Sequence, residues 1–172
     1  ASSSNDYYLY GGGNMASKVE GKTEIIVNDC TTKGQMSVNG GGYGTMAPVS
    51  DTYITVNDFT TKEGDYGLAT IFGGGNAGPV SGGSTISLNG GQVFGDVFGG
   101  GNVASVGTKY PVDGTDEEKE DYLRHYTNLY GSLVTMQSVG PVVYGNIYGG
   151  GNKADIYGDA VVNISNGAFA GE

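Results

Sequence analysis

Short runs in which apolar and polar residues alternate recur along the chain and predict a series of β-strands. Four runs place two aliphatic residues around one intervening residue: Ile25 and Val27, Ile54 and Val56, Ile86 and Leu88, and Val162 and Ile164. The intervening residues are mostly polar, and a fifth run lies around Val134 and Met136. A period of two is the pattern of a strand with one buried face and one face in water.

Each run follows a glycine triplet, which indicates that the chain is built from repeats. The triplets begin at five glycines: Gly11, Gly40, Gly73, Gly99 and Gly149. Their spacings are 29, 33, 26 and 50 residues, and the last becomes 26 when an insert of 24 residues is set aside. Four triplets are followed by asparagine: Asn14, Asn76, Asn102 and Asn152. We divide the chain into five units: about 9–37, 38–70, 71–96, 97–146 and 147–172.

Repeats of this length are typical of solenoids, propellers and arrays. A propeller blade needs about 40 residues and four strands, whereas a unit of 26 residues holds three short strands and their turns. We therefore predict a single all-β domain over residues 1–172, a parallel β-helix or β-solenoid of about five coils. A closed β-barrel or a β-sandwich is the alternative, although neither requires so regular a repeat.

Parity along the strands predicts which side chains face the core. In the segment GQVFGDVFGGG, the opposite parity would bury Asp96 without a partner, at a cost of several kcal/mol, so Val93 and Val97 are expected inside. The outer face then carries a column of aromatic rings: Tyr10, Phe72, Phe98 and Tyr148, flanked by Phe94 and Tyr144. Such rings either form a structural ladder, or fold inward at a bend, or form an exposed strip for sugar rings or another protein.

The triplets and the residues that follow them are expected to form a corner between strands. Glycine accepts positive φ and leaves room for close approach of two backbones. The asparagines after the triplets predict a structural ladder, because Asn tolerates left-handed angles and can hydrogen-bond to its counterpart in the next coil. In the second unit Asn39 replaces the aromatic residue and Tyr43 replaces Asn, so both ladders should be interrupted there.

The fourth unit carries an insert, about residues 109–132, that lacks strand alternation. It holds six of the 18 acidic residues and the only histidine, His125. The segment DEEKEDYLRHYTNL predicts a short helix with acids in its first turn and an apolar side formed by Tyr122, Leu123 and Tyr126. The insert is either a solvated decoration or a binding loop, because solenoids often carry functional loops on one face.

No group of residues in the sequence points to catalysis. The only arginine, Arg124, lies in the insert, and His125 has no Cys or Ser motif nearby. Glycoside hydrolysis needs paired carboxylates, whereas Asp96 and Asp155 stand singly in different units. We predict that the chain is not an enzyme and carries no cofactor.

We also predict no metal site. Calcium-binding β-rolls repeat an Asp every nine residues or so, whereas this chain has Asn at the comparable place and a longer period. Incidental Ca²⁺ binding at Asp113, Asp116 and Glu117 is the alternative that stays open.

Composition limits the partners. The 34 glycines are interleaved with Val, Ile, Tyr and Phe, which favours short strands joined by tight turns. Eight basic against 18 acidic residues give a net charge of −10, which disfavours nucleic acid and anionic lipid as partners. No apolar run approaches the roughly 18 residues needed to span a bilayer. Cys30 stands alone, so no internal disulfide is expected.

The repeat resembles a known kind of protein. The segments VFGDVFGGGNVASVG and VYGNIYGGGNKADIYGDAVVNISNG are similar to glycine-rich β-solenoid repeats of large surface or secreted proteins from anaerobic, gut-type bacteria. The resemblance covers nearly the whole chain except the insert. It implies an extracellular or cell-surface location and a structural or adhesin-like role, with glycans or host surface proteins as candidate partners.

The two ends of the sequence predict self-association. The closing NGAFAGE corresponds to NGGQVFGD, the opening DYYLYGGGN begins a unit, and no capping element is evident in either. Bare coils expose unpaired strand edges. We therefore expect the last coil of one copy to stack on the first coil of the next, a non-closing contact that produces a filament. The alternatives are a piece of a longer solenoid and a carbohydrate-binding adhesin segment.

Overall fold

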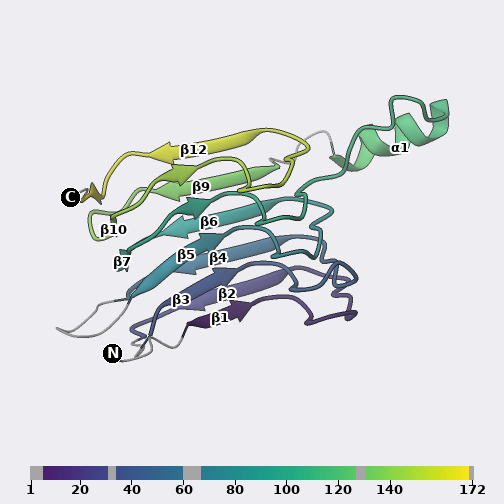
Figure 1. Ribbon diagram of the computed structural model, residues 1–172. Helices are drawn as coiled ribbons and strands as arrows, with labels where there is room; N and C mark the ends of the chain where they lie inside the picture. Colours follow the sequence, from purple (N-terminus) through teal and green to yellow (C-terminus); the bar gives the residue numbers. More distant parts are fainter. Residues whose placement is uncertain (1–5, 31–33, 60–66, 127–130, 171–172) are drawn as a thin grey trace.

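The chain winds into a stack of parallel coils with one helix at its side (Figure 1). The computed structural model describes residues 6–30, 34–59, 67–126 and 131–170. Every pair of neighbouring strands among these residues is parallel, and successive coils lie on top of one another. The predicted all-β parallel β-helix of about five coils is therefore confirmed, and the barrel and sandwich alternatives are excluded.

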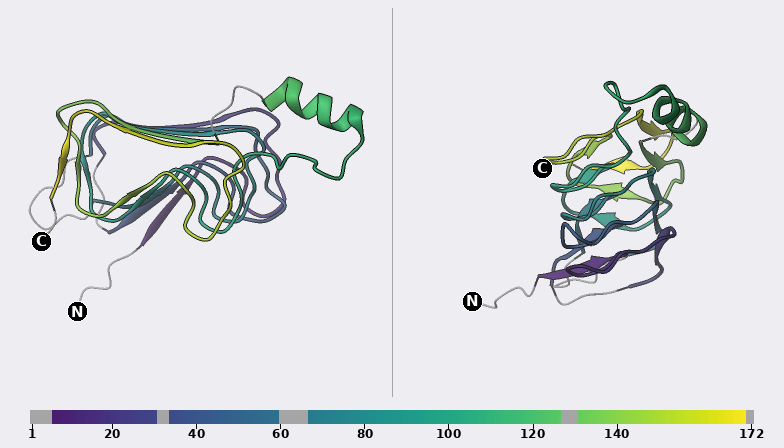
Figure 2. Two further views of the ribbon diagram at one scale, coloured as in Figure 1. Left: turned by 90° about the horizontal axis from the view of Figure 1, so that it is seen from above. Right: turned by 90° about the vertical axis from the view of Figure 1, so that its right-hand side faces the viewer.

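Two parallel sheets run along the stack, and each coil contributes to both. The first sheet contains β1 (Tyr7–Tyr10), β3 (Met36–Asn39), β5 (Leu68–Phe72), β7 (Gln92–Val93), β8 (Val97–Phe98), β10 (Val142–Val143), β11 (Ile147–Tyr148) and β13 (Ala168–Phe169). The second sheet contains β2 (Thr23–Val27), β4 (Thr52–Val56), β6 (Ser84–Leu88), β9 (Ser132–Met136) and β12 (Ala160–Ile164). Viewed along the stack, the coils follow one elongated outline (Figure 2, left).

A third, shorter ladder lies between the two sheets in each coil. It consists of single parallel bridges that join the same position of successive coils: Val19, Val49, Val80, Val106 and Ile156. Because these bridges fix the register independently of the sheets, they define equivalent positions in coils whose lengths differ.

The core lies between the two sheets and follows the alternation of the sequence. The strands of the second sheet show alternating burial, and Ile54 and Ile86 are almost fully covered. Val93 and Val97 also belong to the main core cluster, as the parity argument predicts. Val49, Val80 and Val106 form a second, smaller cluster under the bridge ladder.

The insert forms the helix α1 (Asp116–Tyr126), which projects from the side of the stack (Figure 2). Its first turn is acidic, as expected, and Thr115 begins it with a capping box. The Thr115 amide donates to Glu118 Oε2 (2.7 Å), and the Glu118 amide donates to Thr115 Oγ1 (3.2 Å). No helix among the described residues is long and apolar enough to cross a membrane.

One residue of the expected apolar side makes a ring contact within the insert. Tyr122 meets Tyr110 edge-on at 5.1 Å, whereas Leu123 is exposed. The side chains of His125 and Tyr126 lie outside the described residues. The strand β9 begins at Ser132, after the insert.

Candidate functional site: corner ladders and open end coils

The glycine triplets carry the backbone ladder around the corner that follows the first sheet. The amide of the first glycine donates to the coil above, as from Gly73 to the carbonyl of Phe98 (2.8 Å). The residue after the triplet donates to the coil below, as from Asn102 to the carbonyl of Gly75 (3.0 Å). The corners of the inner coils are thus bonded to both neighbouring coils, so the spacing between coils is fixed there.

Close approach of two backbones, and not positive φ, is the reason for these glycines. A Cβ on Gly73 would lie 2.1 Å from the carbonyl oxygen of Gly99, and a Cβ on Gly99 would lie 2.4 Å from that of Gly149. Among the described residues, the glycines with positive φ are Gly91, Gly107, Gly158 and Gly167, and none of them belongs to a triplet. Of the two reasons that the sequence suggested for the triplets, close approach of the backbones therefore holds and positive φ does not.

The asparagines after the triplets hydrogen-bond from coil to coil. Asn152 Nδ2 donates to Asn102 Oδ1 (2.9 Å), and Asn102 Nδ2 donates to Asn76 Oδ1 (2.7 Å). Tyr43 takes the next place, between Asn76 and Asn14, and its ring separates Asn14 from the run. These amides bind other amides of the same column, which is the arrangement of a structural ladder.

Two further ladders were missed in the sequence. One is a second amide column at the end of the second-sheet strands, in which Asn89 donates to Asn57 (2.9 Å) and Asn57 donates to Asn28 (2.8 Å). The signal was an Asn directly after the alternating run in three units.

The other missed ladder is a row of hydroxyl groups at the start of the second-sheet strands. Each hydroxyl donates to the carbonyl of the first triplet glycine in the next coil. The pairs are Thr23 with Gly40, Thr52 with Gly73, Ser84 with Gly99 and Ser132 with Gly149. In the fifth coil Ala160 stands at this position. Short hydroxyl side chains at one place in four units were the available signal.

The outer aromatic residues form two stacked columns. Phe98 lies between Phe72 (centroids 5.1 Å apart) and Tyr148 (4.9 Å), with nearly parallel planes. Phe94 and Tyr144 stack at 4.7 Å beside them. Phe98 is outside the core cluster, yet it is only 9% exposed, because its neighbours cover both ring faces. An exposed strip at Phe98 is therefore not what the structure has, although Phe94 and Tyr148 are 43% and 45% exposed.

Tyr10 does not join this column, because the second coil has no ring to continue it. Asn39, at the aromatic position of that coil, is buried. Tyr10 instead stacks with Tyr8 (6.4 Å) and meets Tyr43 edge-on (5.3 Å, planes at 67°). Burial, and then the neighbouring Tyr43 and Tyr8, raise the pKa of Tyr10 above its ordinary value.

A groove of about 600 Å³ opens at this interruption. It is lined by three tyrosines and three asparagines: Tyr8, Tyr10, Tyr43, Asn14, Asn76 and Asn102. The sequence predicted the interruption of the ladders but not a groove, because its walls come from four different coils.

The fifth coil leaves the apolar core open at its outer face. Val162 and Ile164 are 40% and 42% exposed, although they occupy the register positions of Val134 and Met136, which are fully buried. At the other end, Leu9 is 36% exposed, whereas its register partner Val38 is fully buried. Within the described residues, each end of the stack therefore presents part of the core to solvent.

The first and fifth coils carry opposite charges at equivalent positions. Lys18 directly precedes Val19 in the bridge ladder, and Asp155 directly precedes Ile156. Lys22 directly precedes β2, and Asp159 directly precedes β12, at the same position of the second sheet. All four side chains are exposed.

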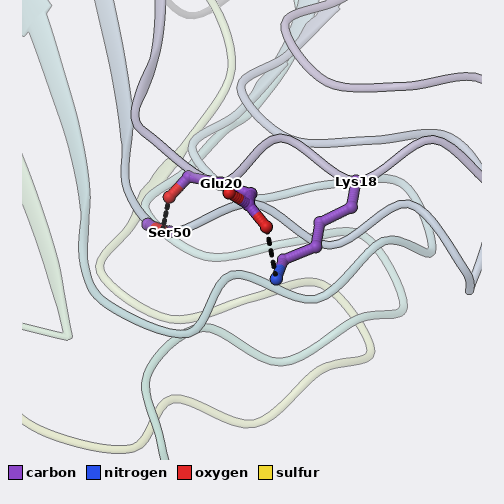
Figure 3. A network of polar contacts seen from close by, with 3 residues as sticks. All are labelled: Lys18, Glu20 and Ser50. Carbon is purple, nitrogen blue, oxygen red and sulfur yellow. Dashed lines mark hydrogen bonds and ion pairs between the residues drawn. The ribbon is translucent and has the colours of Figure 1, made fainter.

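Within the first coil each of these lysines meets a nearby acid. Lys18 Nζ lies 3.3 Å from Glu20 Oε1, and Lys22 Nζ lies 3.8 Å from Glu24 Oε2. Figure 3 shows the first pair and the Ser50 hydroxyl, which donates to the Glu20 carbonyl at 2.8 Å. Such exposed pairs are worth less than about 1 kcal/mol, and Lys22 Nζ also lies 5.3 Å from the centre of the Tyr53 ring in the second coil.

The acidic residues weighed for catalysis have structural contacts. Asp96 Oδ1 accepts from the Asn146 amide (2.8 Å) and from Asn146 Nδ2 (3.1 Å), and thus ties two coils together. Asp155 Oδ2 accepts from the Tyr157 hydroxyl at 3.3 Å. Among the described residues, no three or more His, Cys, Asp or Glu side chains are grouped so that they could hold a metal ion.

Comparisons with protein-family models, with curated proteins and with solved structures give no match. The fold itself defines the class of protein: a parallel β-solenoid with inter-coil amide, hydroxyl and aromatic ladders.

Proposed function

We propose that this chain is a non-enzymatic structural β-solenoid that assembles head to tail, the fifth coil of one copy stacking on the first coil of the next. The observation that carries the proposal is the match between the two open coils: Lys18 and Lys22 stand in the first coil where Asp155 and Asp159 stand in the fifth. Stacking in register would place each lysine next to an aspartate of the other copy.

The hydrogen-bond pattern of the stack supports the same geometry. Inside the molecule the Val106 amide donates to the Asp155 carbonyl (3.1 Å), and the Ser132 amide donates to the Asp159 carbonyl (3.0 Å). One coil further, the amides of Ile156 and Ala160 would meet the carbonyls of Lys18 and Lys22 from the next copy. Parallel edge strands are ready templates for such pairing.

Apolar contacts would supply most of the binding free energy. Val162 and Ile164 would be covered by Ile25 and Val27 of the next copy, which follow the same register. Full burial of such a side chain contributes about 1.5–3 kcal/mol, so covering the open part of each would contribute about 1 kcal/mol. Tyr148 would likewise receive Tyr10 of the next copy, which extends the aromatic column.

One short segment must give way for the coils to meet. β13 occupies the place above β10 that the next copy would fill with the start of its β1. β13 is exposed, and its pairing with β10 includes hydrogen bonds from the Ala168 amide to the Pro141 carbonyl (3.0 Å) and from the Ala170 amide to the Val143 carbonyl (3.1 Å). Releasing it costs about 0.5–1.5 kcal/mol per bond, less than the other contacts of a coil contribute.

Gly150 gives a sharp test of the assembly. In the other four coils, a Cβ on the second triplet glycine would lie 2.7 or 2.8 Å from the third triplet glycine of the next coil. A Cβ on Gly150 meets nothing within 4 Å. Gly150→Ala should therefore leave the isolated molecule intact and block the next copy.

The expected result is filaments of the wild-type chain, seen by electron microscopy and sedimentation, with a repeat of about 4.8 Å per coil. Gly150→Ala should raise the concentration needed for assembly by about 30-fold, which corresponds to about 2 kcal/mol of overpacking. Gly140→Ala is the matched control, because its added methyl has no neighbour closer than 3.4 Å. A wild-type chain that stays monomeric at high micromolar concentration would overturn the proposal.

A charge exchange tests the register. Asp159→Lys and Lys22→Asp should each assemble poorly alone, because like charges would then face each other across the junction. An equimolar mixture should assemble again as an alternating filament, since every junction then pairs a lysine with an aspartate. The difference in assembly between each single variant and the mixture should disappear near 1 M salt, where the screening length falls to about 3 Å. Equal assembly of all samples at low salt would contradict the register.

The resemblance to glycine-rich repeats of bacterial surface proteins supports an extracellular or cell-surface location, in which such a filament would act as a scaffold or adhesive fibre. The structural contacts of Asp96 and Asp155 support a non-enzymatic role, because both carboxylates already bond to neighbouring side chains or backbone.

A further inference from the structure

We propose that the groove at the interrupted second coil, lined by Tyr8, Tyr10, Tyr43 and three asparagines, binds a neutral saccharide. Of the aromatic column that the sequence suggested for sugar binding, Tyr10 lines this groove and the other five rings do not. Because Tyr10 also takes part in the proposed junction between copies, saccharide binding is tested on a variant whose assembly is impaired.

Ring faces decide between the column and the groove. A sugar packs its C–H groups, which carry partial positive charge, against the negative face of an aromatic ring. In the column, the faces of Phe98 are covered by Phe72 and Tyr148. In the groove, Tyr43 is turned 67° from Tyr10 and is 43% exposed. A ring in this orientation is not stacked on Tyr10, so Tyr10 does not cover it as a parallel neighbour.

The amide groups suit hydroxyl groups as partners. Each carboxamide has two N–H donors and an oxygen with two lone pairs. The Asn102 side chain uses one donor toward Asn76 and accepts one bond from Asn152. One donor and one lone pair are thus left for a ligand, and a sugar hydroxyl, which both donates and accepts, can satisfy both. Hydrogen bonds of this kind fix orientation in small-molecule sites.

The charge of the site favours a neutral ligand. Among the described residues that line the groove, none carries a charge at neutral pH, because all of them are tyrosines and asparagines. An ionic ligand would lose its hydration without gaining an opposite charge. The net charge of −10 acts further against acidic saccharides.

Tyr43→Asn is the most informative variant, because Asn is the residue that follows the triplet in the other four units. The substitution should extend the amide ladder while it removes the central ring. Tyr8→Ser is a second variant at an exposed position of the groove. Tyr144→Ser serves as the control, because it removes an exposed ring from the other column.

Binding should be measured by calorimetry on the Gly150→Ala chain, so that assembly does not contribute. The probes are neutral gluco-, manno-, xylo-, galacto- and chito-oligosaccharides, with oligogalacturonate as the acidic comparison and a neutral polar peptide as a further one. We expect at least one neutral oligosaccharide to bind, with an affinity that falls by about tenfold or more in Tyr43→Asn and in Tyr8→Ser. Tyr144→Ser should change the affinity by less than about twofold.

Three results would overturn the proposal. The first is that no neutral probe binds at about 10 mM, a concentration at which even a weak site of Kd near 1 mM would be mostly filled. The second is that the parent chain and both groove variants bind equally well. The third is that the acidic saccharide or the peptide binds more tightly than every neutral saccharide. Circular dichroism of each variant shows that the solenoid is intact, and Tyr43→Asn and Tyr8→Ser test the groove through unrelated positions.

Discussion

Gly100→Ala should destabilise the solenoid, whereas Gly150→Ala, the same substitution one coil further along, should not. Both are the second glycine of a triplet, and neither has positive φ. A Cβ on Gly100 would lie 2.5 Å from Ile156 Cδ1 and 2.8 Å from the amide nitrogen of Gly151. A Cβ on Gly150 meets nothing within 4 Å. The pair therefore separates the effect of the neighbouring coil from the effect of the backbone conformation.

The magnitude follows from the two contacts. Ile156 Cδ1 is the end of a flexible side chain and can move, but the Gly151 backbone can move only if the coils separate by about 0.6 Å, the shortfall from an ordinary 3.4 Å contact. That movement stretches the 3.1 Å bond from the Gly100 amide to the Gly150 carbonyl. Overpacking costs about 1–3 kcal/mol, and a weakened hydrogen bond adds up to about 1 kcal/mol.

The substitution also has a stabilising term that both variants share. Alanine lowers the entropy of the unfolded chain and contributes about 0.4–1 kcal/mol where its conformation is allowed. We therefore expect Gly100→Ala to lower the free energy of unfolding by about 2–3 kcal/mol, and Gly150→Ala to raise it by less than about 1 kcal/mol.

Urea unfolding, followed by circular dichroism at protein concentrations too low for assembly, measures the free energy of unfolding of both variants. Native-state hydrogen exchange can show which coils lose stability, because in a solenoid the stability of each coil depends chiefly on its neighbours. The Gly100→Ala effect should appear in the amides of the fourth and fifth coils. Equal effects of the two substitutions, of either sign, would refute the argument that inter-coil contact requires these glycines.

Two further predictions concern the ladders and the tyrosine cluster. Asn102→Ala removes two hydrogen bonds between asparagine side chains of neighbouring coils and should lower the free energy of unfolding in urea by about 1–2 kcal/mol. An unchanged unfolding midpoint would contradict a stabilising role of this ladder. Tyr10 should ionise above the usual pH in a spectrophotometric titration, assigned by comparison with Tyr10→Phe. The pKa of Tyr10 is higher in the folded state than its ordinary value of 10.0, so its protonated form contributes to the stability of the fold. That contribution is fully present below pH 10 and is lost as the pH rises through the folded-state pKa. Tyr43→Asn should lower the pKa of Tyr10, since Tyr43 is one cause of the shift.

The alternation and the spacing of the glycines were enough to predict the architecture. A strand face is a local property, because neighbouring side chains point to opposite sides. Val93 and Val97 could thus be placed in the core from the cost of burying Asp96, and the structure agrees. The insert helix could also be predicted, because its acidic first turn is a local signal.

Contacts between coils could not be predicted with the same certainty, because they join residues that are far apart in a chain of unequal repeats. The spacings of 29, 33 and 26 residues leave open where each coil absorbs its extra length. In the structure, the pairing of β3 with β5 shifts its register between Met36 and Val38. The bridge ladder, by contrast, joins equivalent residues of all five coils. Only that register shows that Lys22 and Asp159 occupy one position.

The sequence by itself determined the repeat, the buried face of each strand and the place of each corner, since all three depend on residues close together in the chain. The tertiary structure alone decided how near the coils approach. That distance shows why a Cβ is excluded at Gly100 and tolerated at Gly150, and why Phe98 is covered although it points outward. It also shows how an exchange of Asn and Tyr in one coil opens a groove, because the faces of a ring are free only where no ring stacks above or below it.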